Sequence, residues 1–209
     1  MTTICWDVDT QVDFIHHHGA LAVPGSDVIV PQLRALTEWA RRTHTRIVAT
    51  ADDHDLSHAE ISDHPDWVTT FPPHCMRGTP GQEKIPATAL LNPLIVHPVP
   101  HDATALSQAV QEHRGEILIN KPGTDVFRWN PNAAAVLAAL APARIIVYGV
   151  ATDICVLAAV NGFTRLAPKA ELVIVRDAVR ALNDAAGQML LAEWAERGAL
   201  LMTAAEITE

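Results

Sequence analysis

Residues 145–156 read Ile-Ile-Val-Tyr-Gly-Val-Ala-Thr-Asp-Ile-Cys-Val, and the character of the chain changes midway through them. The first four residues are apolar and mostly β-branched, which is typical of a buried strand. Small residues follow, and Cys155 then falls at the start of a predicted helix. The N-terminus of a helix favours a thiolate over a thiol and can receive an oxyanion, so Cys155 is a candidate nucleophile. The alternative interpretation is a small buried hydrophobe, which is the usual role of an isolated cysteine.

Apolar runs of strand length alternate with amphipathic segments of helix length along the chain, which predicts parallel strands joined by crossover helices. The expected fold is Rossmann-like α/β, with three α/β/α layers and a mostly parallel six-stranded sheet. Strands are predicted at residues 4–8, 46–50, 116–120, 144–149, 171–175 and 199–203. Helices are predicted at residues 27–43, 103–114, 132–141, 153–166 and 184–197.

The composition is that of an ordinary globular protein, with 209 residues of which 49% are hydrophobic and 19% charged, and it predicts a single domain over residues 1–209. The net charge of -9, without a Lys/Arg cluster, argues against a nucleic-acid partner. We find no apolar run of membrane-spanning length and no basic leader, so we expect a cytoplasmic protein without a membrane partner. The odd number of cysteines, Cys5, Cys75 and Cys155, predicts reduced thiols.

Three chemically active side chains follow predicted strands. Asp9 comes after the first strand, Lys121 ends the third, and Cys155 follows the fourth. Because the carboxyl ends of parallel strands share one edge of the sheet, we expect these groups to converge. There, Asp9 can accept the thiol proton and Lys121 can stabilise the developing charge. Taken singly, Asp9 can be a turn cap and Lys121 a solvated loop residue.

The segment of about residues 52–100 is rich in His, Pro, Asp and Thr, has little periodicity, and is predicted to be a functional loop insertion. Asp52 and His54 stand two residues apart just after a strand, and His74 arrives later in the run Phe-Pro-Pro-His-Cys at residues 71–75. Two imidazoles and one carboxylate leave open positions on one divalent zinc, iron or manganese ion. An Asp-x-His pattern also occurs by chance, so the spacing leaves a metal-free loop open.

The motifs Asp-Thr-Gln-Val-Asp-Phe at residues 9–14, Lys121 and Gly-Val-Ala-Thr-Asp-Ile-Cys-Val at residues 149–156 resemble those of the isochorismatase-like cysteine hydrolases, especially nicotinamidases. The resemblance covers nearly the whole chain. It implies an Asp-Lys-Cys triad formed by Asp9, Lys121 and Cys155. It also implies a loop that binds metal through Asp52, His54 and His74.

The same resemblance implies how a substrate is held. A cis peptide bond is expected between Val150 and Ala151, with the amides of Ala151 and Cys155 forming an oxyanion hole. Phe14 and Phe71 match aromatic positions that flank a pyridine ring, and Val150 and Asp125 are assigned to the substrate pocket. For the two phenylalanines, plain core packing is the alternative.

The function implied is hydrolysis of nicotinamide, or of a similar aromatic or heteroaromatic amide, to the acid and ammonia through a thioester. A small-molecule amide is the expected partner, and a homo-oligomer the expected assembly. One alternative is a metal-independent cysteine amidase that acts on a carbamoyl or ureido compound. Others are a vinyl-ether hydrolase that relies on the aspartate, and a non-catalytic member of the fold.

Several residues are left open by the pattern. His58 and His64 compete as further metal ligands. Asp53 replaces the aromatic residue that many relatives carry between the metal-binding Asp and His, and it adds negative charge near the expected metal. Asp125 can accept a hydrogen bond from a substrate amide or face solvent. The histidines at positions 16–18 are predicted to form a loop, with a metal-binding or pocket-rim role undecided.

Overall fold

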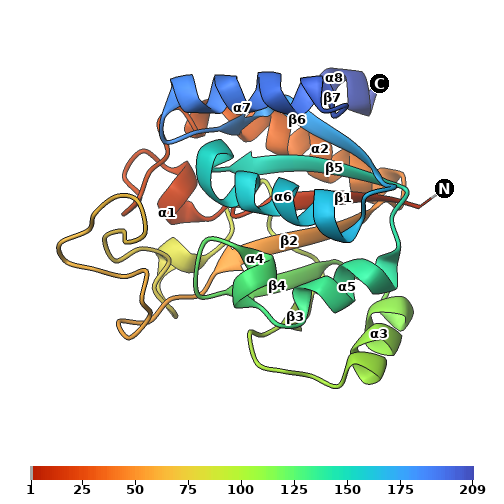
Figure 1. Ribbon diagram of the computed structural model, residues 1–209, viewed down its shortest axis with the longest axis horizontal. Helices are drawn as coiled ribbons and strands as arrows, with labels where there is room; N and C mark the ends of the chain where they lie inside the picture. The colour runs from red at the N-terminus through yellow and green to blue at the C-terminus, as the bar shows by residue number, and fades with distance from the viewer. Residues whose placement is uncertain (1) are drawn as a thin grey trace.

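A computed structural model describes residues 2–209, and within them all strands of one seven-stranded sheet run parallel. The strand order is β3-β4-β2-β1-β5-β6-β7, so the chain starts at the centre of the sheet and winds outward in both directions (Figure 1). The strands are β1 (Thr3–Val8), β2 (Arg46–Asp52), β3 (Leu94–Val96), β4 (Ile117–Lys121), β5 (Arg144–Val150), β6 (Glu171–Arg180) and β7 (Leu200–Met202).

Helices cover both faces of the sheet, which confirms the predicted three-layer α/β fold. One face packs against α2 (Val30–Arg42) and α8 (Ala204–Thr208). The other packs against α3 (Ala103–Glu112), α5 (Ala133–Leu140), α6 (Leu157–Leu166) and α7 (Asp184–Glu196). The shorter elements are α1 (Val12–Ile15), η1 (Asp27–Ile29), η2 (Pro80–Gln82), η3 (Thr152–Val156) and α4 (Val126–Trp129). No helix of residues 2–209 is both long and apolar enough to cross a membrane.

The central strands are buried on both sides, which explains their continuous apolar sequences. In β1, Ile4, Trp6 and Val8 join the core beneath α5 to α7, whereas Cys5 points into the core beneath α2. Successive residues of a strand point to opposite faces, so a sheet covered twice needs apolar residues at every position. Trp6 anchors one core through an edge-on contact with Phe163, with 4.9 Å between the ring centroids.

The sheet has seven strands where the sequence predicted six. The missed strand, β3, spans three residues inside the predicted insertion and is too short to show a periodicity. Strand β6 also runs to Arg180, five residues beyond its predicted end, because its pairing with β5 shifts register between Val147 and Gly149. The helix expected from residue 153 begins with a turn of π-helix, η3, before α6.

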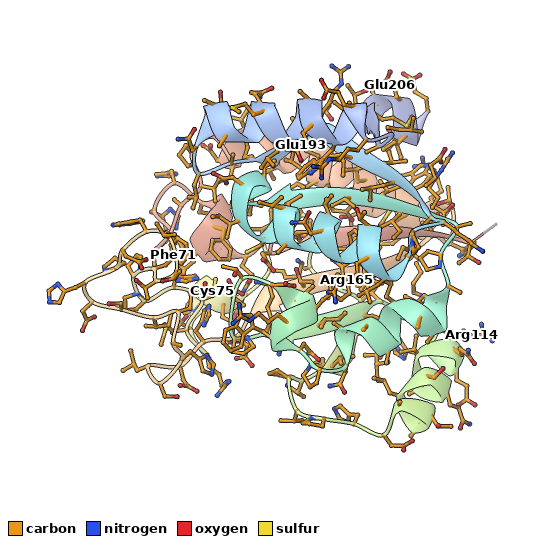
Figure 2. All side chains as sticks on the ribbon, viewed as in Figure 1. Phe71, Cys75, Arg114, Arg165, Glu193 and Glu206 are labelled. Carbon is orange, nitrogen blue, oxygen red and sulfur yellow. The ribbon has the colours of Figure 1, made fainter. Side chains whose placement is uncertain are left out.

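The carboxyl ends of the strands meet the long loop that follows β2. Residues 53–93 hold one short helical turn, η2, and are otherwise irregular, with isolated bridges from His54 to Met76 and from Ile61 to Phe71. Figure 2 shows Phe71 and Cys75 at this end of the molecule and Arg114 at the opposite end. The loop therefore covers the edge where a parallel sheet binds its ligands.

Candidate active site

The three strand-end residues predicted to converge do so in a buried cluster. Lys121 Nζ lies 3.0 Å from Asp9 Oδ2 and 3.6 Å from Cys155 Sγ. A carboxylate oxygen of Asp9 and the Cys155 sulfur lie within 4.8 Å of each other. All three side chains are buried, so a base, a cation and a thiol share one environment shielded from water.

Asp9 is held in a conformation that its own backbone disfavours. Its φ of 46° lies in the left-handed region, which costs free energy for a residue other than glycine. Two contacts hold it there: Thr50 Oγ1 donates a hydrogen bond to Asp9 Oδ1 at 2.6 Å, and Gln11 N donates to the Asp9 carbonyl at 2.7 Å. The turn after β1 thus directs the carboxylate toward Lys121 and Cys155.

Lys121 connects this triad to a second buried acid. Its ammonium forms ion pairs with both Asp9 and Asp52. Burial disfavours the charged amine, but the carboxylates of Asp52 and Asp9 outweigh burial and raise the pKa of Lys121 well above its usual value. Burial likewise favours a protonated Asp52, yet Lys121 holds the pKa of Asp52 well below its usual range. Lys121 therefore stays cationic at neutral pH.

Burial of the Cys155 thiol opposes the thiolate that a helix N-terminus favours. Burial raises the pKa of Cys155 well above its usual value, and the neighbouring Lys121 offsets this only in part. Attack by this sulfur consequently requires a nearby base, and carboxylate oxygens of Asp9 and Asp52 both lie within 4.8 Å of it.

The turn before Cys155 has the geometry that the resemblance implied. The Val150–Ala151 peptide bond is cis. Ala151 and Cys155 line the same cavity, as an oxyanion hole built from their amides requires. The Val150 side chain, which was assigned to the substrate pocket, is fully buried and is not among the residues that line this cavity.

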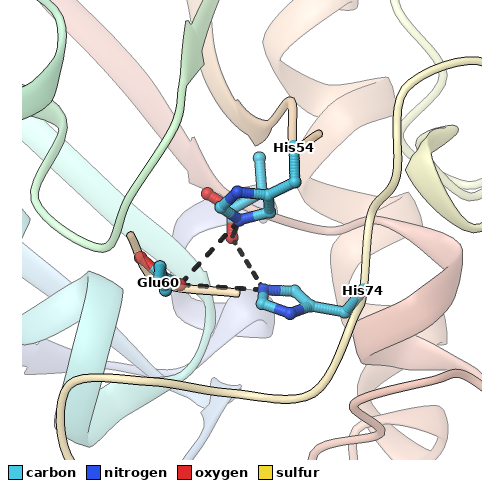
Figure 3. Close-up of side chains that lie close together, drawn as sticks. His54, Glu60 and His74 are labelled. Carbon is cyan, nitrogen blue, oxygen red and sulfur yellow. Dashed lines mark ion pairs between the residues drawn. The ribbon is translucent and has the colours of Figure 1, made fainter. Parts of the chain in front are cut away.

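Four donors form a second buried cluster next to the triad: Asp52, His54, Glu60 and His74, with ligand atoms within 4.8 Å of one another (Figure 3). The Nε2 atoms of His54 and His74 both lie 3.6 Å from Asp52 Oδ2. Glu60 Oε1 lies 3.9 Å from the former and 3.7 Å from the latter. Asp52 Oδ2 and the two Nε2 atoms are buried without a hydrogen-bond partner. Two imidazoles and two carboxylates with orphaned lone pairs fit a divalent cation.

The Nδ1 atoms of both imidazoles, which face away from the cluster, also have neighbours. His74 Nδ1 lies 2.8 Å from the Pro72 carbonyl, which can only accept, so Nδ1 carries the proton and Nε2 keeps a free lone pair. His58 Nδ1 lies 3.4 Å from His54 Nδ1, behind the ligand ring and outside the cluster. His64 is exposed. Of the two histidines considered as further ligands, His58 supports His54 and His64 lies at the surface.

Glu60 was missed by the sequence analysis. It belongs to an irregular part of the loop, where no periodicity shows which side chains point inward. The further ligands expected from this loop were the histidines at positions 58 and 64, not a carboxylate. Only the folded loop brings Glu60 over the site. Burial raises the pKa of Glu60, and the nearby Asp52 adds to the increase.

Both clusters open into one narrow cavity of about 20 Å³, smaller than an aromatic ring, so a substrate must displace side chains to bind. Phe14 and Phe71 line it, as predicted from the resemblance. The complete lining is Phe14, Leu21, Val23, Asp52, Glu60, Phe71, His74, Thr124, Ala151, Ile154, Cys155 and Leu182. Larger cavities of about 300 Å³ and 510 Å³ lie elsewhere in residues 2–209, and neither is lined by a cysteine or an aspartate.

Two acidic residues singled out in the sequence lie away from this cavity. Asp125 caps α4, where its Oδ1 accepts hydrogen bonds from the amides of Phe127 at 2.9 Å and Arg128 at 3.3 Å. Thr124 lines the cavity instead. Asp53 points away from the four donors and pairs with Arg77. The expectations that Asp125 contacts substrate and that Asp53 adds charge beside the metal are therefore not met.

The remaining candidates lie outside the cavity lining. His16 and His18 stack with ring centroids 5.4 Å apart, and His17 meets His18 edge-on at 5.1 Å. Cys5 and Cys75 are fully buried in the core beneath α2. All three cysteines are free thiols, as predicted.

Comparison with known proteins agrees with this fold. Residues 96–206 match the Isochorismatase domain family. The chain is 30% identical to the nicotinamidase/pyrazinamidase of Mycobacterium tuberculosis over 151 residues, which cover 71% of this chain and 72% of that protein. The chain therefore belongs to the isochorismatase family of hydrolases, which confirms the resemblance drawn from its motifs.

Solved structures extend the similarity to nearly the whole fold. The nicotinamidase/pyrazinamidase of Bacillus subtilis superimposes with a TM-score of 0.73 at 22% identity, covering 97% of this chain and 100% of that one. The pyrazinamidase of Pyrococcus horikoshii, solved in complex with zinc, gives a TM-score of 0.71 at 24% identity and covers 97% of this chain and 99% of that one. At these identities the superpositions establish the shared fold.

Proposed function

We propose that this protein is an amidase that hydrolyses nicotinamide, or a similar aromatic or heteroaromatic amide, to the carboxylic acid and ammonia. The observation that carries the proposal is the convergence of Asp9, Lys121 and Cys155 beside four metal donors, three of which have unpaired ligand atoms, next to a cavity that Cys155 lines. Membership of the isochorismatase family and the nicotinamidase/pyrazinamidase relative of Mycobacterium tuberculosis support the choice of substrate class.

Acylation begins with removal of the Cys155 proton. Because burial keeps the thiol protonated, Asp9 takes the proton as the sulfur attacks the carboxamide carbon. The carbonyl oxygen becomes an oxyanion that the amides of Ala151 and Cys155 stabilise. Asp9 then returns the proton to the leaving nitrogen, ammonia departs, and a thioester to Cys155 remains.

Deacylation reuses the same residues. Asp9 removes a proton from a water molecule, the resulting hydroxide attacks the thioester carbonyl, and the carbon–sulfur bond breaks to release the acid. Sulfur takes back the proton, which restores the thiol. Lys121 stays charged throughout, and its contacts with Asp9 and Cys155 balance the negative charge that moves between them.

The four-donor cluster gives the site a means of orienting the substrate. Asp52, His54, Glu60 and His74 would hold one divalent ion, and such an ion, when bound, supplies a Lewis-acidic anchor for a pyridine nitrogen. Phe14 and Phe71 border the space beside it, and the ring can pack against them. The rest of the lining is largely apolar and contains no Arg or Lys, which disfavours ureido substrates that carry a carboxylate.

Cys155→Ala tests the proposal directly. We expect turnover of nicotinamide, followed as ammonia release, to fall by at least about 10⁴-fold, because a nucleophile that acts as part of a unit is not replaceable. Bound metal, measured by elemental analysis, should be unchanged. Cys5→Ala, which removes a buried thiol that does not line the cavity, is the matched control and should keep full turnover. Substantial activity of Cys155→Ala would contradict the proposal.

A small amide panel separates this function from the alternatives. Nicotinamide should react faster than benzamide, which has the same shape but no ring nitrogen, and both should react faster than an N-carbamoyl amino acid. Rapid turnover of the ureide by metal-free protein would instead support a metal-independent amidase. The expected homo-oligomer stays a prediction, which sedimentation measurements can decide.

A further inference from the structure

Asp53 stands between two residues of the four-donor cluster and yet faces the other way. Neighbouring residues at the end of a strand alternate in direction, so Asp52 points into the site and Asp53 points out of it. The Asp53 side chain is nonetheless buried, with 7% of its surface exposed. A buried carboxylate needs partners. Asn120 Nδ2 of β4 donates to Asp53 Oδ2 at 3.5 Å, and the shorter hydrogen bonds come from the returning part of the loop.

Two residues of the returning loop bind this carboxylate. Arg77 Nε donates a hydrogen bond to Asp53 Oδ1 at 2.8 Å, and Gln82 Nε2 donates to the same oxygen at 2.7 Å. Arg77 lies three residues after His74. The ion pair therefore links the segment that carries Asp52 and His54 to the segment that carries His74.

Backbone contacts show that the two segments are fastened side by side at this point. His54 N donates to the Cys75 carbonyl at 3.2 Å, and Arg77 N donates to the His54 carbonyl at 2.8 Å. Gln82 continues the connection, because its carbonyl accepts from Gln11 Nε2 at 2.8 Å. Gln11 in turn binds both the amide and the carbonyl of Asp52. The hydrogen bonds thus run from Asp53 through Gln82 and Gln11 back to Asp52.

We propose that Asp53 is a positioning residue, which through Arg77 and Gln82 clamps the two halves of the loop at the spacing that the four donors need to bind a divalent metal. The inference rests on the metal-binding role proposed above. It gives a function to the residue by which this chain departs from the aromatic residue of many relatives. Partners behind metal ligands set ligand orientation, and their loss typically weakens metal binding by about 10–100-fold.

Zinc affinity of the metal-free protein, measured by competition with a chromophoric chelator, tests the clamp without relying on activity. Asp53→Asn and Arg77→Met should each raise the zinc dissociation constant by about tenfold. The double variant should bind zinc like either single variant, because both changes remove the same interaction. Arg77→Lys, which keeps the charge, should recover part of the affinity.

Asp63→Asn is the matched control. Asp63 is an exposed acid on the same loop and lies outside the clamp, so its removal should leave zinc affinity unchanged. Melting temperatures of the metal-free variants report folding separately. Arg77 is 55% exposed, so Arg77→Met still carries the test if Asp53→Asn fails to fold.

The outcomes separate the clamp from the metal site itself. If the parent protein binds no zinc, the metal-binding role is wrong. If both single variants bind zinc as tightly as the parent does while their melting temperatures fall, the Asp53–Arg77 pair only stabilises the fold. That outcome would contradict the clamp. If the effects of Asp53→Asn and Arg77→Met multiply in the double variant, the residues act independently, which also contradicts the clamp.

Discussion

The triad and the four-donor cluster share one cavity but are positioned by different means. Asp9 directly follows β1, Lys121 is the last residue of β4, and Cys155 lies in the turn η3 that follows β5, so the register of the sheet places all three. Of the four donors, only Asp52 lies on a strand, and the other three lie on the irregular loop. Sheet register depends on the whole fold, whereas the loop depends on a few individual contacts. Changes to the triad should therefore affect stability and chemistry together, and changes to the three metal donors of the loop should affect metal binding alone.

The largest effect is expected for Lys121→Met. This change leaves the carboxylates of Asp9 and Asp52 buried without their cation, which should lower the free energy of unfolding by about 3–5 kcal/mol and abolish turnover. Urea denaturation and ammonia release measure the two effects. Lys169→Met, which removes an exposed lysine, is the control and should change neither. A Lys121→Met protein with an unchanged free energy of unfolding would show that the triad does not need its cation for stability.

Glu60→Gln should affect the four-donor cluster alone. Loss of one anionic donor should raise the metal dissociation constant by at least about tenfold, with the melting temperature of the metal-free protein nearly unchanged. His64→Ala, on the same loop but exposed, should bind metal as the parent does. Chelator competition measures both variants. Equal affinity of the two variants would remove Glu60 from the proposed ligand set.

The three thiols should differ in their reaction with iodoacetamide. Burial raises the pKa of Cys155, so its thiolate fraction at pH 7 is below that of free cysteine, and the rate should keep rising as the pH increases through about 9. Cys5 and Cys75 have raised pKa values as well, but they are sealed in the core and should stay unmodified. Peptide mass spectrometry quantifies each site. A Cys155 that reacts fully at pH 6 would contradict a protonated resting thiol.

The smallest effect is expected at the tip of the loop. Asp66 accepts hydrogen bonds from the amides of Val68, Thr69 and Thr70, which lower its pKa. The sign follows from the depressed pKa: the stabilisation is present above about pH 4 and is lost as the pH falls toward the folded-state value. Asp66→Asn should lower the melting temperature at pH 7 by less than about 2 °C, with metal affinity unchanged. A change in metal affinity would show that the tip is coupled to the four donors.

The triad could be predicted from the sequence because strand ends are visible in it. Each residue follows an apolar run, and parallel strands bring their carboxyl ends to one edge. The protonation state of Cys155 could not be predicted, because desolvation depends on how completely the cavity closes around the sulfur. The same holds for β3, whose three residues pair with β4 only after the surrounding chain has folded.

The loop, in contrast to the triad, could be predicted only in part from the sequence. The sequence marked Asp52, His54 and His74 by residue type, but it did not reveal Glu60 or the outward direction of Asp53. Without periodicity, residue order does not say which side chains face inward, and long-range hydrogen bonds decide it. Asp125 is a similar case, since its use as a helix cap depends on the short helix α4 that follows it.

Hydrophobic patterning by itself determined the α/β class, the two covered faces of the sheet and the edge at which chemistry takes place. The reason is that the spacing of apolar residues along the chain indicates which positions are buried. The tertiary structure alone decided which loop side chains enter the cavity, which donor completes the metal cluster, and how the buried charges divide between Lys121 and its two carboxylates. These features depend on distances between residues far apart in sequence, and only the folded chain brings such residues together.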